Sequence, residues 1–220
     1  MCTDNFIGKI MKNLHLIDHP LIKRDISILR DKATASEDFR IVLKRLASLM
    51  VFEVTRDLKL KSYQLETPLE KTEGYTTADE VILVPVLRAG LGMLEAYLAF
   101  IPNAKVGHIG LYRDETTLKP VDYYAKFPPN LSKSVVIHID PMLATGGSAS
   151  AAIQYLKQRE AKNIRLNCVV AAPEGVALLE KEHPDVKVFA AVLDRKLNQH
   201  GYIVPGLGDA GDRIFGTLKG

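Results

Sequence analysis

The sequence contains no tryptophan and only two cysteines, Cys2 and Cys168. Because neither belongs to a Cys-x-x-Cys pair, the sequence predicts no disulfide framework and no structural zinc site. Sparse cysteine of this kind is typical of the reducing cytosol, and we expect a cytoplasmic protein. The sequence also lacks the run of about 20 apolar residues that a membrane-spanning helix needs, and residues 1–13 lack the pattern of a secretory signal. We therefore expect no membrane partner.

A strong net charge is also absent. The sequence carries 29 Lys and Arg residues against 26 Asp and Glu residues, a formal net charge of +3. Nucleic-acid-binding domains usually concentrate basic residues on one surface, so we expect no nucleic-acid partner. Hydrophobic residues make up 47% and charged residues 25% of the 220 positions. These values are ordinary for a globular protein and exclude a disordered or collagen-like chain.

Short apolar runs alternate with helical patterns from residue 81 onwards. We predict strands over residues 81–87, 105–112, 134–139, 164–172 and 186–193. We predict helices over residues 90–101, 148–160 and 174–182. This alternation predicts an α/β fold with about five parallel strands, covered by helices on both faces of the sheet.

The first 80 residues are predicted to be mainly helical. Apolar residues recur at helical spacing over residues 39–54, and the Ser-Glu-Asp at 36–38 is expected to cap and charge the start of that helix. Residues 63–75 are expected to be irregular or to form short strands. Residues 110–126 are expected to form an antiparallel hairpin that projects from the sheet.

We expect one domain over residues 1–220. It would consist of an N-terminal helical segment (about 1–60), a core (about 80–195) and a C-terminal loop (201–216). The helical segment, the hairpin over 110–126 and the C-terminal loop would together form a hood over the sheet.

The strongest chemical signal lies where the predicted strand over 134–139 ends. Asp140 follows this strand, and the Thr-Gly-Gly-Ser at 145–148 opens the next predicted helix. Glycines let the backbone approach a ligand closely, and the free amides of a helix N-terminus bind phosphate. A carboxylate repels phosphate but accepts hydrogen bonds from sugar hydroxyls. The pattern therefore predicts a sugar-phosphate site; an ordinary helix cap is the alternative interpretation.

Two arginines suit a strongly anionic substrate, because the guanidinium fork matches phosphate oxygens. Arg88 immediately follows the apolar run over 81–87, so it is expected at the carboxyl end of a strand. Arg113 directly follows the predicted strand over 105–112. The alternatives are a surface charge for Arg88 and a local ion pair with the neighbouring acids for Arg113.

Residues 206–211 read Gly-Leu-Gly-Asp-Ala-Gly, a literal Gly-x-Gly-x-x-Gly. Too few residues follow Gly211 for the βαβ unit of a dinucleotide site, so that interpretation fails. A glycine-rich loop that presents backbone groups to a flat polar base is favoured instead. A plain C-terminal loop is the alternative.

Four stretches together resemble the type I phosphoribosyltransferases. Residues 137–148 are similar to the phosphoribosyl diphosphate loop of that superfamily, and residues 84–93 to its diphosphate loop. Residues 110–115 are similar to the segment that supplies a second arginine, and residues 201–216 to a uracil-binding loop. Most of the superfamily has two adjacent acids before the first of these loops. Here Ile139 precedes Asp140, the pattern of the uracil phosphoribosyltransferase branch.

The resemblance implies a reaction and a set of site residues. Uracil and 5-phospho-α-D-ribose 1-diphosphate (phosphoribosyl diphosphate) would give UMP and diphosphate in pyrimidine salvage. Arg113 and Asp209 would be catalytic. The implied phosphoribosyl diphosphate contacts are Arg88, Arg113, Asp140, Pro141, Met142, Leu143, Ala144, Thr145, Gly146, Gly147, Ser148 and Asp209. The implied uracil contacts are Ile203, Gly208, Asp209 and Ala210.

The resemblance also implies features beyond these contacts. A strained, sometimes cis, peptide bond is expected near Arg88. Mg²⁺ would be the cofactor and would arrive on the substrate, with no certain protein ligand. A homodimer or homotetramer and a GTP effector are expected from the family. Asp209 would orient the Mg²⁺–diphosphate, stabilise positive charge on ribose or assist loss of the uracil N1 proton, and these roles stay open.

Two other functions remain as alternatives. One is a related transferase for another base, which would keep residues 140–148 and change the base loop. The other is a non-enzymatic regulator on the same fold that binds RNA, which the mild charge disfavours.

Overall fold

A central sheet organises the molecule, which the computed structural model describes over residues 12–113 and 120–217. Its strands lie in the order β1–β11–β10–β8–β4–β6–β7, with β5 beside β4 and β9 beside β10. The strands are β1 (Leu14–Leu16), β4 (Val81–Leu87), β5 (Lys105–Val106), β6 (His108–Arg113), β7 (Pro120–Lys126), β8 (Val135–Ile139), β9 (Met142–Leu143), β10 (Asn163–Ala171) and β11 (Lys187–Leu193). Among these described strands every pairing is parallel except that of β6 with β7. The predicted parallel sheet is confirmed.

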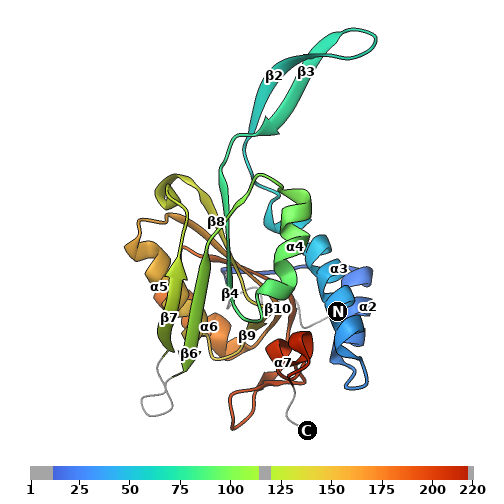
Figure 1. Ribbon diagram of the computed structural model, residues 1–220. Coiled ribbons are helices and arrows are strands. Elements are labelled where there is room, and N and C mark those ends of the chain that lie inside the picture. The colour runs from blue at the N-terminus through green and yellow to red at the C-terminus, as the bar shows by residue number, and fades with distance from the viewer. Residues whose placement is uncertain (1–11, 114–119, 218–220) are drawn as a thin grey trace.

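Helices cover both faces of this sheet (Figure 1). On one face a buried apolar cluster joins the sheet to α2 (Pro20–Arg30), α3 (Ser36–Val54), α4 (Leu91–Phe100) and α7 (Ala210–Phe215). On the other face a second cluster includes residues of α5 (Gly147–Gln158) and α6 (Pro173–Glu182). Side chains alternate between the two clusters along β8, with Ile137 in the first and Val136 in the second. Strands buried on both faces are predominantly apolar, which explains the nearly continuous apolar runs in the sequence.

The long helix α3 forms as predicted, but its start differs from the prediction. Ala35 occupies the cap position and Ser36 is the first helical residue, so the serine does not cap the helix. Glu37 and Asp38 lie in the first turn, where their negative charges favour the helix dipole. No described helix is long and apolar enough to cross a membrane.

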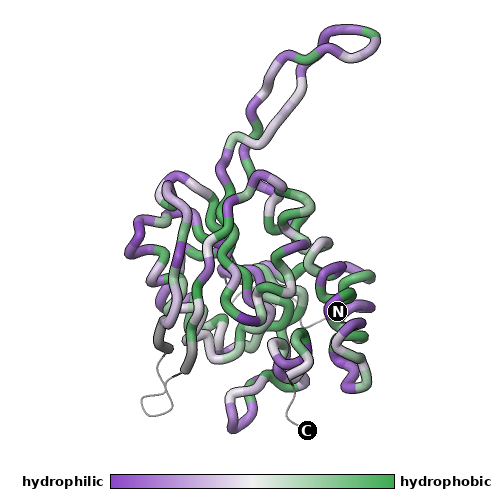
Figure 2. The backbone as a smooth tube through the Cα atoms, in the orientation of Figure 1, coloured by the Kyte–Doolittle hydropathy of each residue, from purple (hydrophilic) through white to green (hydrophobic). Residues whose placement is uncertain are grey.

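A free-standing hairpin projects from one end of the molecule (Figure 1). It consists of the antiparallel strands β2 (Leu60–Glu66) and β3 (Lys71–Thr77). Most of its residues are exposed, and Leu69 at its tip is 95% exposed. Figure 2 shows hydrophilic residues along much of its length. The sequence predicted only irregular structure or short strands here.

The hairpin predicted over residues 110–126 forms from β6 and β7, with its tip at 114–119 outside the described residues. β6 also pairs in parallel with β4. This hairpin therefore extends the edge of the main sheet, and the projecting arm of the molecule is β2–β3 instead. Gly110 allows the two strands to pack, because a Cβ there would lie 2.4 Å from the Tyr123 ring.

The C-terminal segment packs against the first of the two buried clusters through Ile203, Leu207 and Ile214. It contains the two-residue strands β12 (Lys196–Leu197) and β13 (Ile203–Val204), which pair in antiparallel fashion, and the helix α7. Figure 1 shows α7 at the end of the molecule opposite the β2–β3 arm. A short 3₁₀ helix, η1 (Leu131–Lys133), precedes β8.

Candidate active site

The carboxyl ends of the parallel strands bring the predicted site residues to one edge of the sheet. Arg88 follows β4 and Asp140 follows β8; Asp194, which is not among the predicted site residues, follows β11. Arg113 is the last residue of β6, and its side chain lies outside what the structure describes. Because these strands pair in parallel, the four positions lie at the same edge of the sheet. Ligands of open α/β sheets bind at this edge.

The segment after Asp140 is held by the sheet before it reaches the helix. Met142 and Leu143 form β9 beside β10, and the Pro141 carbonyl accepts hydrogen bonds from two β10 amides at 2.9 and 3.0 Å. The Leu143 side chain is buried in the core, at 1% exposed. Of these three residues, only backbone groups and the half-buried Met142 side chain are placed to meet a ligand.

The start of α5 has the geometry of an anion site. Gly146 caps this helix with φ +82° and has no side chain to occupy the first-turn amides. Thr145 and Ser148 beside it are exposed, so their hydroxyls are accessible. The Thr145 hydroxyl lies 3.5 Å from the Gly147 amide. Free amides, a helix dipole and two hydroxyls together suit a phosphate.

Helix α6 packs against the back of this loop through Gly175. A Cβ at Gly175 would lie 2.4 Å from the Ala144 carbonyl oxygen and 3.1 Å from that of Leu143. A Cβ at Gly146 would lie 2.9 Å from the Gly175 carbonyl oxygen. The two glycines therefore let backbone meet backbone, and α6 fixes the position of the loop.

A second contact between α5 and α6 lies one turn further along. The Ser150 hydroxyl donates to the Glu182 carboxylate at 2.5 Å and lies 2.9 Å from His183 Nε2. Ser150 and His183 are both buried. This cluster joins the helix that begins at the anion site to the end of α6.

The Asp140 carboxyl has an unusual proton affinity. Burial raises its pKa to about 7, although the Met142 amide, 3.3 Å from Oδ1, acts in the opposite direction. Ionising an acid in such surroundings is unfavourable unless a donor compensates. Sugar hydroxyls would be such donors.

Arg88 connects the end of β4 to the C-terminal helix. Its Nη2 lies 3.1 Å from Asp212 Oδ1, and its guanidinium carbon lies 5.7 Å from the centre of the Phe215 ring. An exposed ion pair contributes at most about 1 kcal/mol, so a phosphate can replace Asp212 at little cost. The Leu87–Arg88 peptide bond is cis, which confirms the expectation for this position.

The C-terminal segment lies close to the anion site. A Cβ at Gly201 would lie 3.7 Å from Thr145 Cγ2. Ile203 and Ala210 have buried side chains, so only their backbone groups are open to a ligand. Gly208 is exposed with φ +72°, and Asp209 caps α7 by accepting a 2.9 Å hydrogen bond from the Asp212 amide.

A family model described as uracil phosphoribosyltransferase matches residues 16–217. The chain belongs to this family. Uracil phosphoribosyltransferases of Finegoldia magna and Bacillus cereus are each 56% identical to it over 208 residues, which is 94% of this chain and 100% of theirs. The solved structure of the AQ2163 protein from Aquifex aeolicus has a TM-score of 0.87 and 37% identity, and covers 92% of this chain and 97% of that one.

Membership of the uracil phosphoribosyltransferase family confirms the predictions of fold and enzyme class. The protein is a transferase of the pentosyl class with the predicted α/β phosphoribosyltransferase fold, and its predicted activity is confirmed at the level of the family. The roles given to individual residues stay predictions.

Sequence reasoning missed the two arginines that hold the C-terminal segment of this uracil phosphoribosyltransferase. Arg30, at the end of α2, pairs with the buried Asp194. Arg213, in α7, donates to the carbonyl oxygens of Leu29 and Leu207. These bonds join residues far apart in the chain, and no spacing in the sequence marks them. They form the part of the predicted hood that joins the N-terminal helices to the C-terminal segment.

Proposed function

We propose that the protein converts uracil and phosphoribosyl diphosphate to UMP and diphosphate, a reaction of pyrimidine salvage. The observation that carries this proposal is the closeness of two segments. The glycine-rich C-terminal segment approaches the anion site to within 3.7 Å, measured from a Cβ at Gly201 to Thr145 Cγ2. A ribose 5-phosphate on one segment would place its anomeric carbon near a base on the other.

The loop before α5 would hold the phosphoribosyl group. Thr145–Ser148 would bind the 5-phosphate through free amides and hydroxyls. Asp140, ionised, would accept hydrogen bonds from the ribose hydroxyls. The backbone of Pro141, Met142, Leu143 and Ala144 would complete the contact, since the sheet and α6 hold this stretch in place.

The diphosphate would be bound by Arg88 and Arg113, whose positions at the ends of β4 and β6 place them on neighbouring strands. Among the described residues no group of three or more His, Cys, Asp or Glu side chains could hold a metal ion. Magnesium sites often use one or two carboxylates together with substrate phosphates, so this site fits Mg²⁺ that arrives on the diphosphate. Bound there, the ion would neutralise charge that develops on the leaving group.

Uracil would be bound by backbone groups of Ile203, Gly208 and Ala210 and by Asp209. Backbone N–H groups would donate to O2 and O4, and a backbone carbonyl would accept from N3–H. Cytosine presents the reverse pattern at positions 3 and 4, so buried groups would be left unpaired and cytosine would be rejected.

The reaction would be a displacement at the anomeric carbon. The bond from C1 to uracil N1 forms, the bond from C1 to the diphosphate oxygen breaks, and the N1 proton leaves. Arg113 would stabilise the leaving charge. The family resemblance implies that Asp209 acts beside both substrates. Its Oδ1 accepts a hydrogen bond from the Asp212 amide, and its side chain is exposed, which leaves the carboxylate accessible. Most of the rate enhancement would come from holding uracil N1 close to C1 of the ribose in the orientation needed for reaction.

An assay with radiolabelled uracil tests the proposed reaction. Labelled UMP should form only when phosphoribosyl diphosphate and Mg²⁺ are both present. Cytosine, orotate and hypoxanthine should give little product. Efficient transfer to one of these other bases would overturn the uracil assignment, and salt-dependent RNA binding without UMP formation would support the regulator instead.

Self-association is proposed from the β2–β3 arm. A two-stranded hairpin alone in water is marginally stable, and this one is exposed over most of its length. A second copy that covers the arm would give a homodimer, and two dimers a homotetramer. Light scattering on the intact protein tests this, and a monomer at micromolar concentration would contradict it.

The GTP effector is proposed on the family resemblance alone. UMP formation should rise when GTP is added, and an unchanged rate would contradict the proposal. A cytoplasmic location is proposed from the cysteine usage.

A further inference from the structure

One ion pair holds the C-terminal segment from the opposite end of the chain. Arg30 is the last residue of α2, and Asp194 follows β11. Arg30 Nη2 donates to Asp194 Oδ1 at 2.6 Å, and Arg30 Nη1 donates to Oδ2 at 3.1 Å. The side chains are 23% and 4% exposed. A two-point contact of this kind fixes orientation as well as distance.

The pair binds both backbone polar groups of Gly206. The Gly206 amide donates to Asp194 Oδ2 at 2.8 Å, and the Gly206 carbonyl accepts from Arg30 Nη1 at 3.3 Å. Gly206 is buried with φ +64°, and a Cβ there would lie 2.2 Å from the Ile203 carbonyl oxygen. The chain at this residue is therefore held in one conformation by a pair of side chains from elsewhere in the fold.

Gly206 lies inside the segment proposed to bind uracil, between Ile203 and Gly208. Little regular structure supports this segment from within, because β13 has only two residues. Arg213 adds support from the same direction: it donates to the carbonyl oxygens of Leu207 and Leu29, and Leu29 is the neighbour of Arg30 in α2. Residues 29 and 30 at the end of α2 thus hold the C-terminal segment in place through hydrogen bonds.

We infer that Arg30 and Asp194 are positioning residues for uracil: they hold Gly206 so that the backbone groups on either side of it meet the base. This inference rests on the proposed role of residues 203–210 in uracil binding. Neither residue needs to touch the substrate. Their loss should weaken the use of uracil and leave the use of phosphoribosyl diphosphate nearly unchanged, because the anion site is supported separately by α6.

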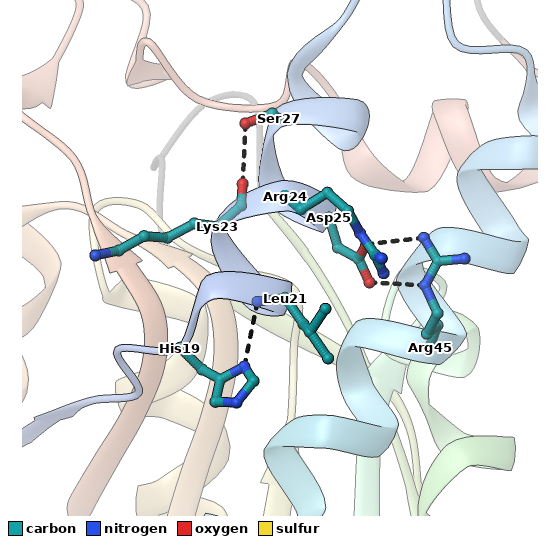
Figure 3. Close-up of polar contacts among 7 residues, drawn as sticks. All are labelled: His19, Leu21, Lys23, Arg24, Asp25, Ser27 and Arg45. Atoms are coloured by element: carbon teal, nitrogen blue, oxygen red, sulfur yellow. Dashed lines mark hydrogen bonds and ion pairs between the residues drawn. The ribbon is translucent and has the colours of Figure 1, made fainter.

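The chain offers a matched control in a second Arg–Asp pair, in which the aspartate is buried (Figure 3). Arg45 donates from Nε and from Nη2 to the two oxygens of Asp25, at 2.8 Å each. The Asp25 side chain is 0% exposed, and the pair joins α2 to α3. It makes the same kind of contact as Arg30 with Asp194 but binds neither Gly206 nor Asp194.

The experiment compares Arg30→Gln with Arg45→Gln in steady-state kinetics, with each substrate varied in turn. Arg30→Gln should raise the KM for uracil about tenfold, the effect of losing one or two hydrogen bonds, and change the KM for phosphoribosyl diphosphate less than about twofold. Arg45→Gln should leave both KM values near those of the wild type, whatever it does to thermal stability. An equal rise of both KM values in Arg30→Gln, or an unchanged KM for uracil, would overturn the inference.

A second variant covers the case in which Arg30→Gln does not fold. The double variant Arg30→Met with Asp194→Asn removes both charges together, so that no buried charge is left unpaired, and the same selective rise in the KM for uracil is expected. Gly208→Ala separates the two proposals. If Gly208→Ala raises the KM for uracil and the Arg30 variants do not, the positioning role is wrong and the loop assignment stands. If neither changes it, the loop assignment itself is wrong.

Discussion

At the scale of single residues, Asp140 shows how a binding group differs from a structural one. Burial raises the pKa of its carboxyl to about 7, so below that pH the folded protein without substrate favours the protonated form. A raised pKa means that this group stabilises the fold at low pH and that this stabilisation is lost as the pH rises toward 7. A ribose bound through its hydroxyls needs the ionised form. The stability of the fold therefore favours the protonated form of Asp140, whereas substrate binding favours the ionised form.

Asp140→Asn should change the stability of the fold and the binding of phosphoribosyl diphosphate in opposite directions. The variant should melt a few degrees higher than the wild type at pH 8, and the gain should shrink at pH 5, where the carboxyl is protonated in the folded state. Its kcat/KM for phosphoribosyl diphosphate at pH 8 should fall at least about tenfold, the effect of one lost charge-assisted hydrogen bond. Thermal melts at the two pH values and initial rates measure both. A variant that is less stable at pH 8 and fully active would contradict the account of Asp140.

Asp209→Ala should remove most of the turnover and leave the fold intact. Asp209 caps only the short helix α7, and losing an N-cap typically costs about 1 kcal/mol of stability. If the carboxylate acts beside both substrates, kcat should fall about a hundredfold or more. Near-normal turnover in a folded variant would show that Asp209 serves only as a helix cap.

At the scale of elements, the sequence predicted the positions of strands best where the strands are most deeply buried in the fold. β4 and β8 lie in the middle of the sheet, and their continuous apolar runs located them and the residues Arg88 and Asp140 that follow them. The arm strands β2 and β3 have no apolar face to pack, so they lack the alternation that marks a strand. The two-residue strands β12 and β13 are too short for any periodic pattern, and α7 was not predicted.

Gly175→Ala tests the role of α6 as the support of the anion site. The added methyl group would lie 2.4 Å from the Ala144 carbonyl oxygen, so the loop must move. A displacement of this size at a binding group should raise the KM for phosphoribosyl diphosphate about tenfold or more, with a smaller effect on uracil.

The control for this variant is Ala177→Gly, at an exposed position of the same helix. It should lower helix stability by about 1 kcal/mol without touching the loop. Its KM for phosphoribosyl diphosphate should stay near the wild-type value. If both variants raise this KM equally, the effect comes from the helix and not from the contact with the loop.

At the scale of the whole molecule, the site exists because distant parts of the chain meet at one sheet edge. The neighbouring strands β8, β4 and β6 bring the positions of Asp140, Arg88 and Arg113 to this edge. The sequence predicted Arg88 and Asp140 at the carboxyl ends of strands, and the family resemblance implied the role of Arg113. Nothing comparable predicted that Arg30 would hold Asp194 and Gly206, 164 and 176 positions away. A contact between the end of a helix and an irregular segment far along the chain leaves no period in the sequence, so only the folded chain reveals it.

The most direct measurement is a crystal structure of the protein with UMP bound. The phosphate should lie against Thr145–Ser148, and the uracil ring should lie against the backbone of residues 203–210, with the ribose hydroxyls toward Asp140. A product molecule bound at another face of the fold, or one whose base points away from the C-terminal segment, would contradict the proposed site.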